Sequence, residues 1–293
     1  MKNLRVVIRK ILSAREYESI EDALLRKKIE IEKHFYKTKF SKEELRRSLN
    51  DIGVVEGTQL IVHASWRQFY NFKGSPDDVI DILKEAVGES GTLLMPAYGH
   101  DKFLFDVKNT PSAAGVISEV FREKPDTYRS PCTNFSVAAS GKYAKQLTEQ
   151  HINSIYGFDK YSPYYLLSEY NNSKVLFLGL SSRPTKISLF HCAGYILKDK
   201  IPFYENIYTE KIKTELIYEG HHYNKNMITR NPKYMNDNKV FKEIFRNIKN
   251  KNSLKISNLD IVMIDLNEGL EKALDFAHKG KYCYKMNRRI GIK

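Results

Sequence analysis

Most of the chain alternates between short apolar runs and amphipathic helical patterns. The apolar runs include 58–65 (TQLIVHAS), 91–98 (GTLLMPAY) and 174–180 (KVLFLGL), and helical patterns at 75–88 and 114–124 lie between them. Strands that alternate with helices at this spacing are typical of an α/β sheet with some parallel strands. The sequence therefore predicts an α/β fold with a mixed, partly parallel central sheet flanked by helices.

The segment before this alternation, residues 1–38, is predicted to be a helical extension, because apolar residues recur in it at helical spacing. The extension packs on the domain, packs on a second subunit in a homodimer, or binds a membrane surface through residues 1–12. Of these alternatives, membrane contact is the least favoured. The next helix is expected to begin at Ser41, with Glu44 completing a capping box, and to end at Gly53.

Residues 39–293 are expected to form one domain. Within it, residues 200–235 are rich in Tyr, Asn and Lys and show little periodicity, which predicts a β-ribbon or lid insertion.

Composition predicts a soluble, cytoplasmic protein. Hydrophobic residues make up 42% and charged residues 28% of the 293 residues, and no apolar run is long enough to span a bilayer. The basic first residues carry too short an apolar run for a signal peptide. The three cysteines, Cys132, Cys192 and Cys283, form no paired motif, which favours a reducing compartment.

The formal net charge is +13. Such a charge is typical of a protein with a polyanionic partner, an anionic membrane surface or a phosphate-bearing small substrate, although it also arises from the residue bias of an AT-rich genome. No zinc-finger spacing, RNP-like motif or helix-turn-helix pattern accompanies it, so nucleic-acid binding is the least favoured function.

The turn that enters the helix at 75–88 is a candidate phosphate site. Lys73 and Gly74 precede a helix whose free N–H groups would attract an anion. The alternative is a helix that is already capped by Ser75 and whose dipole is balanced by Asp77 and Asp78. The pattern is neither GxGxxG nor a P-loop, so both interpretations stay open.

The stretch 187–195 (ISLFHCAGY) places His191 beside Cys192. Adjacent side chains diverge on a helix or a strand, so His191 is poorly placed to activate this thiol, and Cys192 is expected to fill the core. The histidines show no metal-ligand spacing, and no metal site is expected. His191 itself is either a general base or a packing residue.

Several spaced motifs together resemble the aminoglycoside 3-N-acetyltransferase family. Residues 60–98 resemble its VHxSL…GGxxxVIDAL…GTLxMPxY signature, and 109–122 (NTPSAAGVISEVFR) resemble TPSxxGxxxExFR. Residues 129–141 (RSPCTNFSVAASG) resemble RSxHPxxSxAAxG, and the segment from 161 to 180 resembles SPxxxL…LLLG. The resemblance begins near Ser41 and leaves residues 1–38 outside.

This resemblance implies an acyltransferase that moves an acetyl group from acetyl-CoA to an amine of an amino sugar. His191 matches the family's general base and would take a proton from the attacking ammonium, while a donor near Ser65 would stabilise the oxyanion. Cys132 stands where the family has His or Asp and completes the candidate catalytic residues. The residues implied to bind the cofactor are Ser65, Lys73, Gly74, Ser75, Thr110 and Ser112.

The chain departs from the family pattern at Gly194, where the family has Glu, and at Cys132 and Thr133. With the positive net charge, these departures favour an anionic acceptor, such as a nucleotide-linked amino sugar for surface polysaccharide. The alternatives are an aminoglycoside acceptor, which would confer antibiotic resistance, and a catalytically weakened relative that binds CoA.

Overall fold

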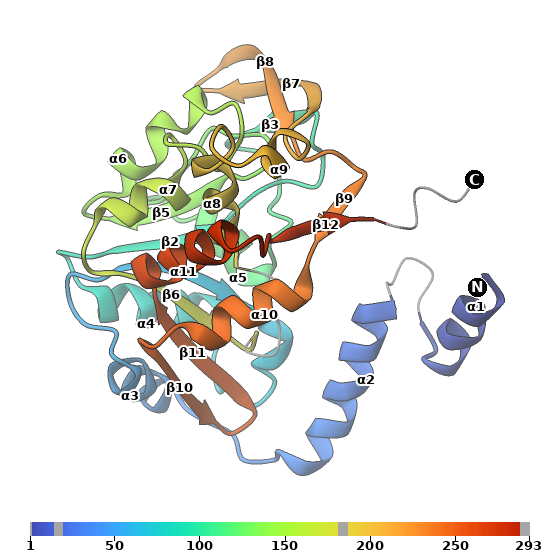
Figure 1. The fold of residues 1–293 in the computed structure, drawn as a ribbon. Helices are drawn as coiled ribbons and strands as arrows, with labels where there is room; N and C mark the ends of the chain where they lie inside the picture. The colour runs from blue at the N-terminus through green and yellow to red at the C-terminus, as the bar shows by residue number, and fades with distance from the viewer. Residues whose placement is uncertain (1, 15–19, 181–186, 288–293) are drawn as a thin grey trace.

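The computed structural model describes residues 2–14, 20–180 and 187–287, and Figure 1 shows how its helices and strands are arranged. The helices in these ranges are α1 (Lys2–Ile11), α2 (Ile20–Phe35), α3 (Lys42–Ile52), α4 (Pro76–Val87), α5 (Val116–Arg122), α6 (Ala144–Thr148), α7 (Pro163–Leu166), α8 (Phe190–Ile196), α9 (Pro202–Glu205), α10 (Asn238–Asn247) and α11 (Leu266–His278). The strands are β1 (Gln59–Ala64), β2 (Thr92–Pro96), β3 (Leu104–Asp106), β4 (Tyr128–Arg129), β5 (Val137–Gly141), β6 (Ser173–Leu178), β7 (Glu210–Tyr218), β8 (His221–Thr229), β9 (Tyr234–Asn236), β10 (Lys251–Ile256), β11 (Leu259–Asp265) and β12 (Tyr284–Met286).

The central sheet has the strand order β10-β11-β6-β1-β2-β5-β4 within the described residues. β1 pairs in parallel with both β2 and β6, whereas the pairs outside this trio are antiparallel. The sheet is therefore mixed and partly parallel, and the predicted α/β fold class is confirmed.

Both faces of the central sheet are covered by helices. Leu60 and Val62 of β1 point into a core with α3, α4 and α5, while Ile61 points into a second core with α6, α7, α8, α10 and α11. None of these three side chains is more than 2% exposed. Burial on both faces explains why β1 has a continuous apolar run and no alternation with polar residues.

α3 begins and ends as the sequence predicts. The Ser41 hydroxyl accepts a hydrogen bond from the Glu44 N–H (3.2 Å), and the Glu44 carboxylate accepts one from the Ser41 N–H (2.7 Å). Gly53 ends the helix with φ of 101°, a left-handed conformation that favours glycine. The predicted capping box is therefore present.

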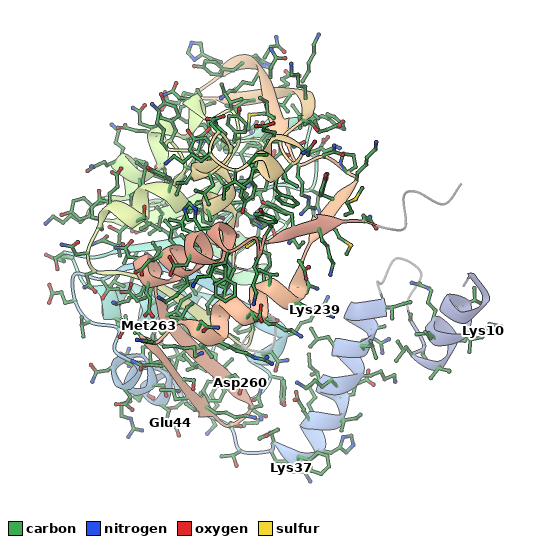
Figure 2. All side chains as sticks on the ribbon, viewed as in Figure 1. Lys10, Lys37, Glu44, Lys239, Asp260 and Met263 are labelled. Atoms are coloured by element: carbon green, nitrogen blue, oxygen red, sulfur yellow. The ribbon has the colours of Figure 1, made fainter. Side chains whose placement is uncertain are left out.

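The N-terminal helices α1 and α2 lie to one side of the sheet domain (Figure 1). In Figure 2, Lys10 marks α1 on the outer side, and Lys37 marks the link from α2 to the domain. The Tyr36 carbonyl accepts a hydrogen bond from Asn71 Nδ2 (2.8 Å), and the Tyr36 hydroxyl accepts one from Lys255 Nζ (2.7 Å). These bonds anchor the extension at the end of α2. Of the helices described, none has the length and apolar character needed to cross a membrane.

The segment 200–235 contains α9 and the antiparallel pair β7–β8. β3 adds to β7 in parallel, so these strands form a small sheet separate from the central one. A two-stranded ribbon therefore makes up most of this segment.

The buried Arg129 on β4 holds the segment that crosses from β2 to α5. Its Nε donates to the Ala97 carbonyl (3.0 Å), and its Nη1 donates to the carbonyls of Val107 (3.0 Å) and Thr110 (2.6 Å). The guanidinium lies 4.5 Å from the centre of the Phe105 ring. Burial lowers the pKa of Arg129 to about 10, and the group stays charged at neutral pH. One side chain thus fixes several carbonyls of this crossing segment.

Arg129→Met is expected to lower the free energy of unfolding by about 2–3 kcal/mol, because it leaves buried carbonyls without their charged donor. Urea unfolding measures the change. The control is Arg46→Met, which removes an exposed ion pair with Glu85 (2.7 Å) and should cost less than about 1 kcal/mol. Equal losses in both variants would contradict the anchoring role of Arg129.

Candidate active site

A cavity of about 610 Å³ opens at the carboxyl ends of the three parallel strands. Ala64 at the end of β1, Pro96 at the end of β2 and Leu180 just after β6 all line it. Parallel pairing brings these ends to one edge of the sheet, where ligands bind in open α/β folds. Other residues that line the cavity are Leu25, Ser65, Arg67, Asn134, Ser188 and His191.

His191 lies in the first turn of α8 and reaches the cavity from beside the sheet. Its Nδ1 lies 2.7 Å from the Tyr284 hydroxyl, and the two rings stack with 5.5 Å between their centroids. Phe158 and Phe241 contact the imidazole at centroid distances of 5.0 Å and 5.7 Å. Three aromatic rings therefore fix the imidazole, whose Nε2 has no hydrogen-bond partner in the described part of the chain.

The environment of His191 keeps its imidazole neutral. Burial lowers the pKa of His191 to about 3, and the positive charge of Arg230 acts in the same direction. Arg230 lies 5.6 Å from the centre of the Tyr284 ring. No carboxylate of the described residues forms a hydrogen bond or ion pair with the imidazole. A neutral imidazole with a free nitrogen is the state that a general base requires.

Gly194 stands where the resemblance implies a Glu, and a tyrosine fills the space that a side chain would need. A Cβ at residue 194 would overlap the Tyr208 hydroxyl and lie 3.2 Å from Tyr204 Cε1. The Tyr208 hydroxyl donates to the His191 carbonyl (3.4 Å) and lies 3.5 Å from the Tyr284 hydroxyl. Tyrosine hydroxyls thus surround His191 at the place where a carboxylate was implied.

Ser65 lies directly after β1 and lines the cavity. Its N–H donates to the Leu178 carbonyl (3.0 Å), and its carbonyl accepts from the Gln68 N–H (2.9 Å). The backbone N–H is therefore already used within the sheet edge. Its hydroxyl has no hydrogen bond to any described residue, so it is the part of Ser65 that can donate to a ligand.

Neither thiol of interest faces the cavity. Cys192 is fully buried in the core beneath α8, and burial raises its pKa. Cys132 is buried with Ile212 and Met227, does not line the cavity, and also has a raised pKa because of burial. Both thiols therefore stay protonated. The buried position of Cys192 is the one expected of a residue that fills the core. The structure does not bring Cys132 to the cavity with His191 and Ser65.

The turn at Lys73, Gly74 and Ser75 does not line the cavity. The Asp78 carboxylate accepts the Ser75 N–H (2.7 Å), and the Ser75 hydroxyl accepts the Asp78 N–H (3.2 Å). An ion pair with Lys42 is the largest cause that lowers the pKa of Asp78 to about 2. The start of α4 is thus capped by Ser75 and by the Asp78 carboxylate of its own first turn. This is the already capped helix, one of the two interpretations that the sequence left open. Cofactor binding by these three residues stays a prediction.

Thr110 and Ser112 lie on the segment that Arg129 anchors. Thr110 Oγ1 accepts the Asp106 N–H (2.8 Å) and is therefore occupied. Ser112 lines a groove of about 390 Å³ that shares Ala113 and Gly115 with the main cavity. Ser112 therefore lies on a groove that adjoins the main cavity, whereas Thr110 lines neither the groove nor the cavity.

Sequence reasoning missed several residues that the fold brings to the site. Arg67 and Asn134 line the cavity from the loops after β1 and β4, and Leu25 lines it from the N-terminal extension. Tyr208 and Tyr284 reach His191 from later in the chain. The WR dipeptide in the stretch after β1 was a usable signal for Arg67, because loops after parallel strands carry ligand-binding residues. The tyrosines carried no local signal.

Gly194→Ala is expected to lower the free energy of unfolding by about 1–3 kcal/mol, because the added methyl group overlaps the Tyr208 hydroxyl. In the Tyr208→Phe background the same change should cost less, because the overlapping oxygen is gone. Urea unfolding of the two single variants and the double variant measures this coupling. Additive losses would show that Tyr208 does not fill the space beside residue 194.

A pH dependence of stability follows from the buried histidines. His151 is fully buried between the Ser130 hydroxyl (2.8 Å) and the Gly157 carbonyl (3.2 Å), and burial lowers its pKa from 6.5 to about 4. The unfolded chain therefore binds more protons as the pH falls below 6.5. The free energy of unfolding should fall by about 1.2 kcal/mol for His151 between pH 6 and 5. His191, whose pKa burial also lowers, contributes in the same direction.

Urea unfolding at pH 7, 6 and 5 tests this dependence, with the slope compared between the wild type and His151→Phe. Compared with the wild type, the stability of the variant should fall by about 0.7 kcal/mol less between pH 7 and 6 and by about 1.2 kcal/mol less between pH 6 and 5, whatever its absolute stability. An unchanged slope would mean that His151 does not stay neutral in the folded protein.

Comparisons with known proteins add a family to this geometry. The sequence model described as aminoglycoside 3-N-acetyltransferase matches residues 61–277, more than half of the chain. Aminoglycoside N(3)-acetyltransferase IV of Salmonella sp is 37% identical over 109 residues, which is 36% of this chain and 41% of that protein. The SPbeta prophage-derived aminoglycoside N(3')-acetyltransferase-like protein YokD of Bacillus subtilis (strain 168) is 27% identical over 190 residues, or 56% of this chain and 66% of that protein. Each alignment thus spans less than two thirds of the curated relative.

Solved structures share the fold. The apoenzyme of aminoglycoside acetyltransferase AAC(3)-IVa superposes with a TM-score of 0.71 at 22% identity, covering 87% of this chain and 95% of that one. AAC-IIIb in a binary complex with CoASH gives a TM-score of 0.73 at 20% identity, covering 84% and 98%. With the match of the family model over most of the chain, the protein belongs to the aminoglycoside 3-N-acetyltransferase family.

Proposed function

We propose that this protein transfers an acetyl group from acetyl-CoA to an amine of an aminoglycoside or a related amino sugar. The observation that carries the proposal is the neutral, rigidly held His191, whose free Nε2 belongs to a cavity at the carboxyl ends of three parallel strands. Membership of the family supports the reaction class.

The cavity and its adjoining groove suit an extended thioester substrate. Ser65 lines the cavity, Ser112 lines the groove, and Ala113 and Gly115 line both. Arg67 on the cavity wall supplies a cation for phosphate groups. Acetyl-CoA, when bound, supplies an acetyl group activated as a thioester. CoASH binding by the structural relative AAC-IIIb supports this choice, and no group of three or more His, Cys, Asp or Glu among the described residues is arranged to hold a metal.

His191 and Ser65 divide the chemical work in this proposal. His191 Nε2 takes the proton from the acceptor ammonium, so that the neutral amine attacks the thioester carbonyl. A C–N bond forms and the C–S bond breaks. His191 returns the first proton to the departing sulfur, and the nitrogen loses a second proton to solvent as the amide forms. The Ser65 hydroxyl donates a hydrogen bond to the carbonyl oxygen as negative charge develops there. No covalent enzyme intermediate is needed, since the cavity holds both reactants together.

The names of the relatives favour an aminoglycoside acceptor over the nucleotide-linked amino sugar that the sequence favoured. The Salmonella relative is named as an aminoglycoside acetyltransferase, and so are the relatives from Streptomyces paromomycinus and Serratia marcescens. The nucleotide-linked acceptor, which net charge and Gly194 favoured, is therefore less well supported than the aminoglycoside. The net charge of a chain does not say where the charges lie relative to the site.

A nucleotide-linked amino sugar remains the second candidate acceptor because of the charges at the cavity. Among the described residues that line it, none is Asp or Glu, and the basic ones are Arg67, His63 and the neutral His191. Polycationic aminoglycosides gain most from carboxylates, whereas a diphosphate gains from an arginine.

His191→Gln is expected to lower kcat for acetyl transfer by about 10²–10⁴-fold, the usual contribution of a general base. A thiol-release assay with gentamicin-type amines and nucleotide-linked amino sugars measures turnover, and calorimetry checks that CoA still binds. His221→Gln, on the exposed face of β8, is the control and should keep full activity. The proposal is overturned if the wild type acetylates neither acceptor class, or if His191→Gln is as active as the wild type.

A further inference from the structure

The tyrosines beside His191 form a chain of hydroxyl groups that ends at a backbone carbonyl. His191 Nδ1 lies 2.7 Å from the Tyr284 hydroxyl, which lies 3.5 Å from the Tyr208 hydroxyl. The Tyr208 hydroxyl in turn donates to the carbonyl of His191 itself, at 3.4 Å. The three groups therefore close a ring of polar contacts around one residue.

The carbonyl fixes the direction of the Tyr208 proton, because a carbonyl only accepts. Tyr208 has a single hydroxyl proton, and donation to the carbonyl leaves its oxygen to accept from Tyr284. When the Tyr284 hydroxyl donates to Tyr208, its own oxygen accepts a hydrogen bond from His191 Nδ1. In this arrangement His191 carries its proton on Nδ1 and keeps the lone pair on Nε2.

We propose that Tyr208 and Tyr284 are positioning residues that select the Nδ1–H tautomer of His191 and so keep its Nε2 free to act as a base. The task is one that a carboxylate performs in other catalytic histidine arrangements, by accepting from the imidazole. Here both partners are neutral, so the imidazole is oriented without a negative charge that would raise its pKa.

Three features of the surroundings support this assignment. Burial raises the pKa of Tyr208 and of Tyr284, so both hydroxyls keep their protons. Gly194 leaves room for the Tyr208 hydroxyl, which any larger side chain at that position would displace. Arg230, beside the Tyr284 ring, is the charged group that acts on both Tyr284 and His191. It disfavours a protonated imidazole and leaves the choice of tautomer to the hydroxyls.

The opposite direction of these hydrogen bonds predicts the other tautomer of His191. If Tyr208 donated to Tyr284 and Tyr284 donated to Nδ1, the proton of His191 would lie on Nε2, and no base would face the cavity. The two arrangements differ only in proton positions, which nitrogen spectroscopy distinguishes directly.

The test is ¹⁵N NMR of protein labelled at the histidine rings, at pH 7 and without substrates. The His191 signals are those that disappear in His191→Gln. The wild type should show a protonated Nδ1 and an unprotonated Nε2. In Tyr208→Phe, the Tyr284 proton loses its acceptor and can donate to Nδ1, so the Nε2–H tautomer should gain by about ten-fold. In Tyr284→Phe the imidazole loses its partner, and the two tautomers should mix.

Tyr282→Phe is the matched control, because Tyr282 stacks on Phe203 (3.9 Å between centroids) and makes no hydrogen bond to His191, Tyr208 or Tyr284 in the described part of the chain. Its His191 signals should match the wild type. The inference is overturned if wild-type His191 carries its proton on Nε2, or if both Tyr208→Phe and Tyr284→Phe leave the tautomer unchanged.

The role of the tautomer in catalysis rests on the proposed function, and kinetics separate the two. Tyr208→Phe should lower kcat in proportion to the fraction of His191 that leaves the base tautomer, with little change in the KM for acetyl-CoA. The expected tautomers in a protein that acetylates no amine would overturn the proposed function alone. Full activity with an unchanged tautomer in both tyrosine variants would overturn this inference alone.

Discussion

The parallel pairing of β1 with both β2 and β6 is the constraint on which the site depends. It sends three strand ends to one edge of the sheet, and the loops that follow them, at Ser65, at Tyr98 and at Leu180, form the cavity wall. Two helical layers bury both faces of these strands. The loops therefore rest on a rigid frame, which a site with fixed catalytic geometry requires.

The protonation state of His191 is set by burial of its imidazole in surroundings without a negative charge. His191 is enclosed by aromatic rings, and its only polar partner through Nδ1 among the described residues is the Tyr284 hydroxyl. This environment favours a neutral imidazole and leaves Nε2 open to the cavity. Gly194 belongs to the same arrangement, since its missing side chain makes room for Tyr208. The departure from the family pattern is thus accompanied by a different set of groups around the histidine.

Local sequence patterns predicted much of the fold. The apolar runs of β1, β2 and β6 and the capping box at Ser41 are written in contiguous residues, and the structure contains each of them. The ribbon β7–β8 and the separate sheet that it forms with β3 could not be predicted in register, because strand pairing joins residues that no local pattern relates.

The candidate site was predictable only in part. His191 and Ser65 came from motifs, and both line one cavity. The cap of α4 left two interpretations, and the contact between Ser75 and Asp78 favours the self-capped helix. The bond from His191 to Tyr284 joins residues 93 positions apart, so no spacing rule could reveal it. Leu25 is a similar case, because the sequence placed its segment outside the resemblance.

The most direct test of the central claim is a crystal structure of the protein with CoA and an amino-sugar acceptor bound together. The account predicts that the acceptor nitrogen lies about 2.6–3.2 Å from His191 Nε2, within hydrogen-bonding reach, with the CoA sulfur on the same side of the cavity as Ser65. An acceptor amine bound away from His191, or CoA bound outside this cavity, would contradict the account.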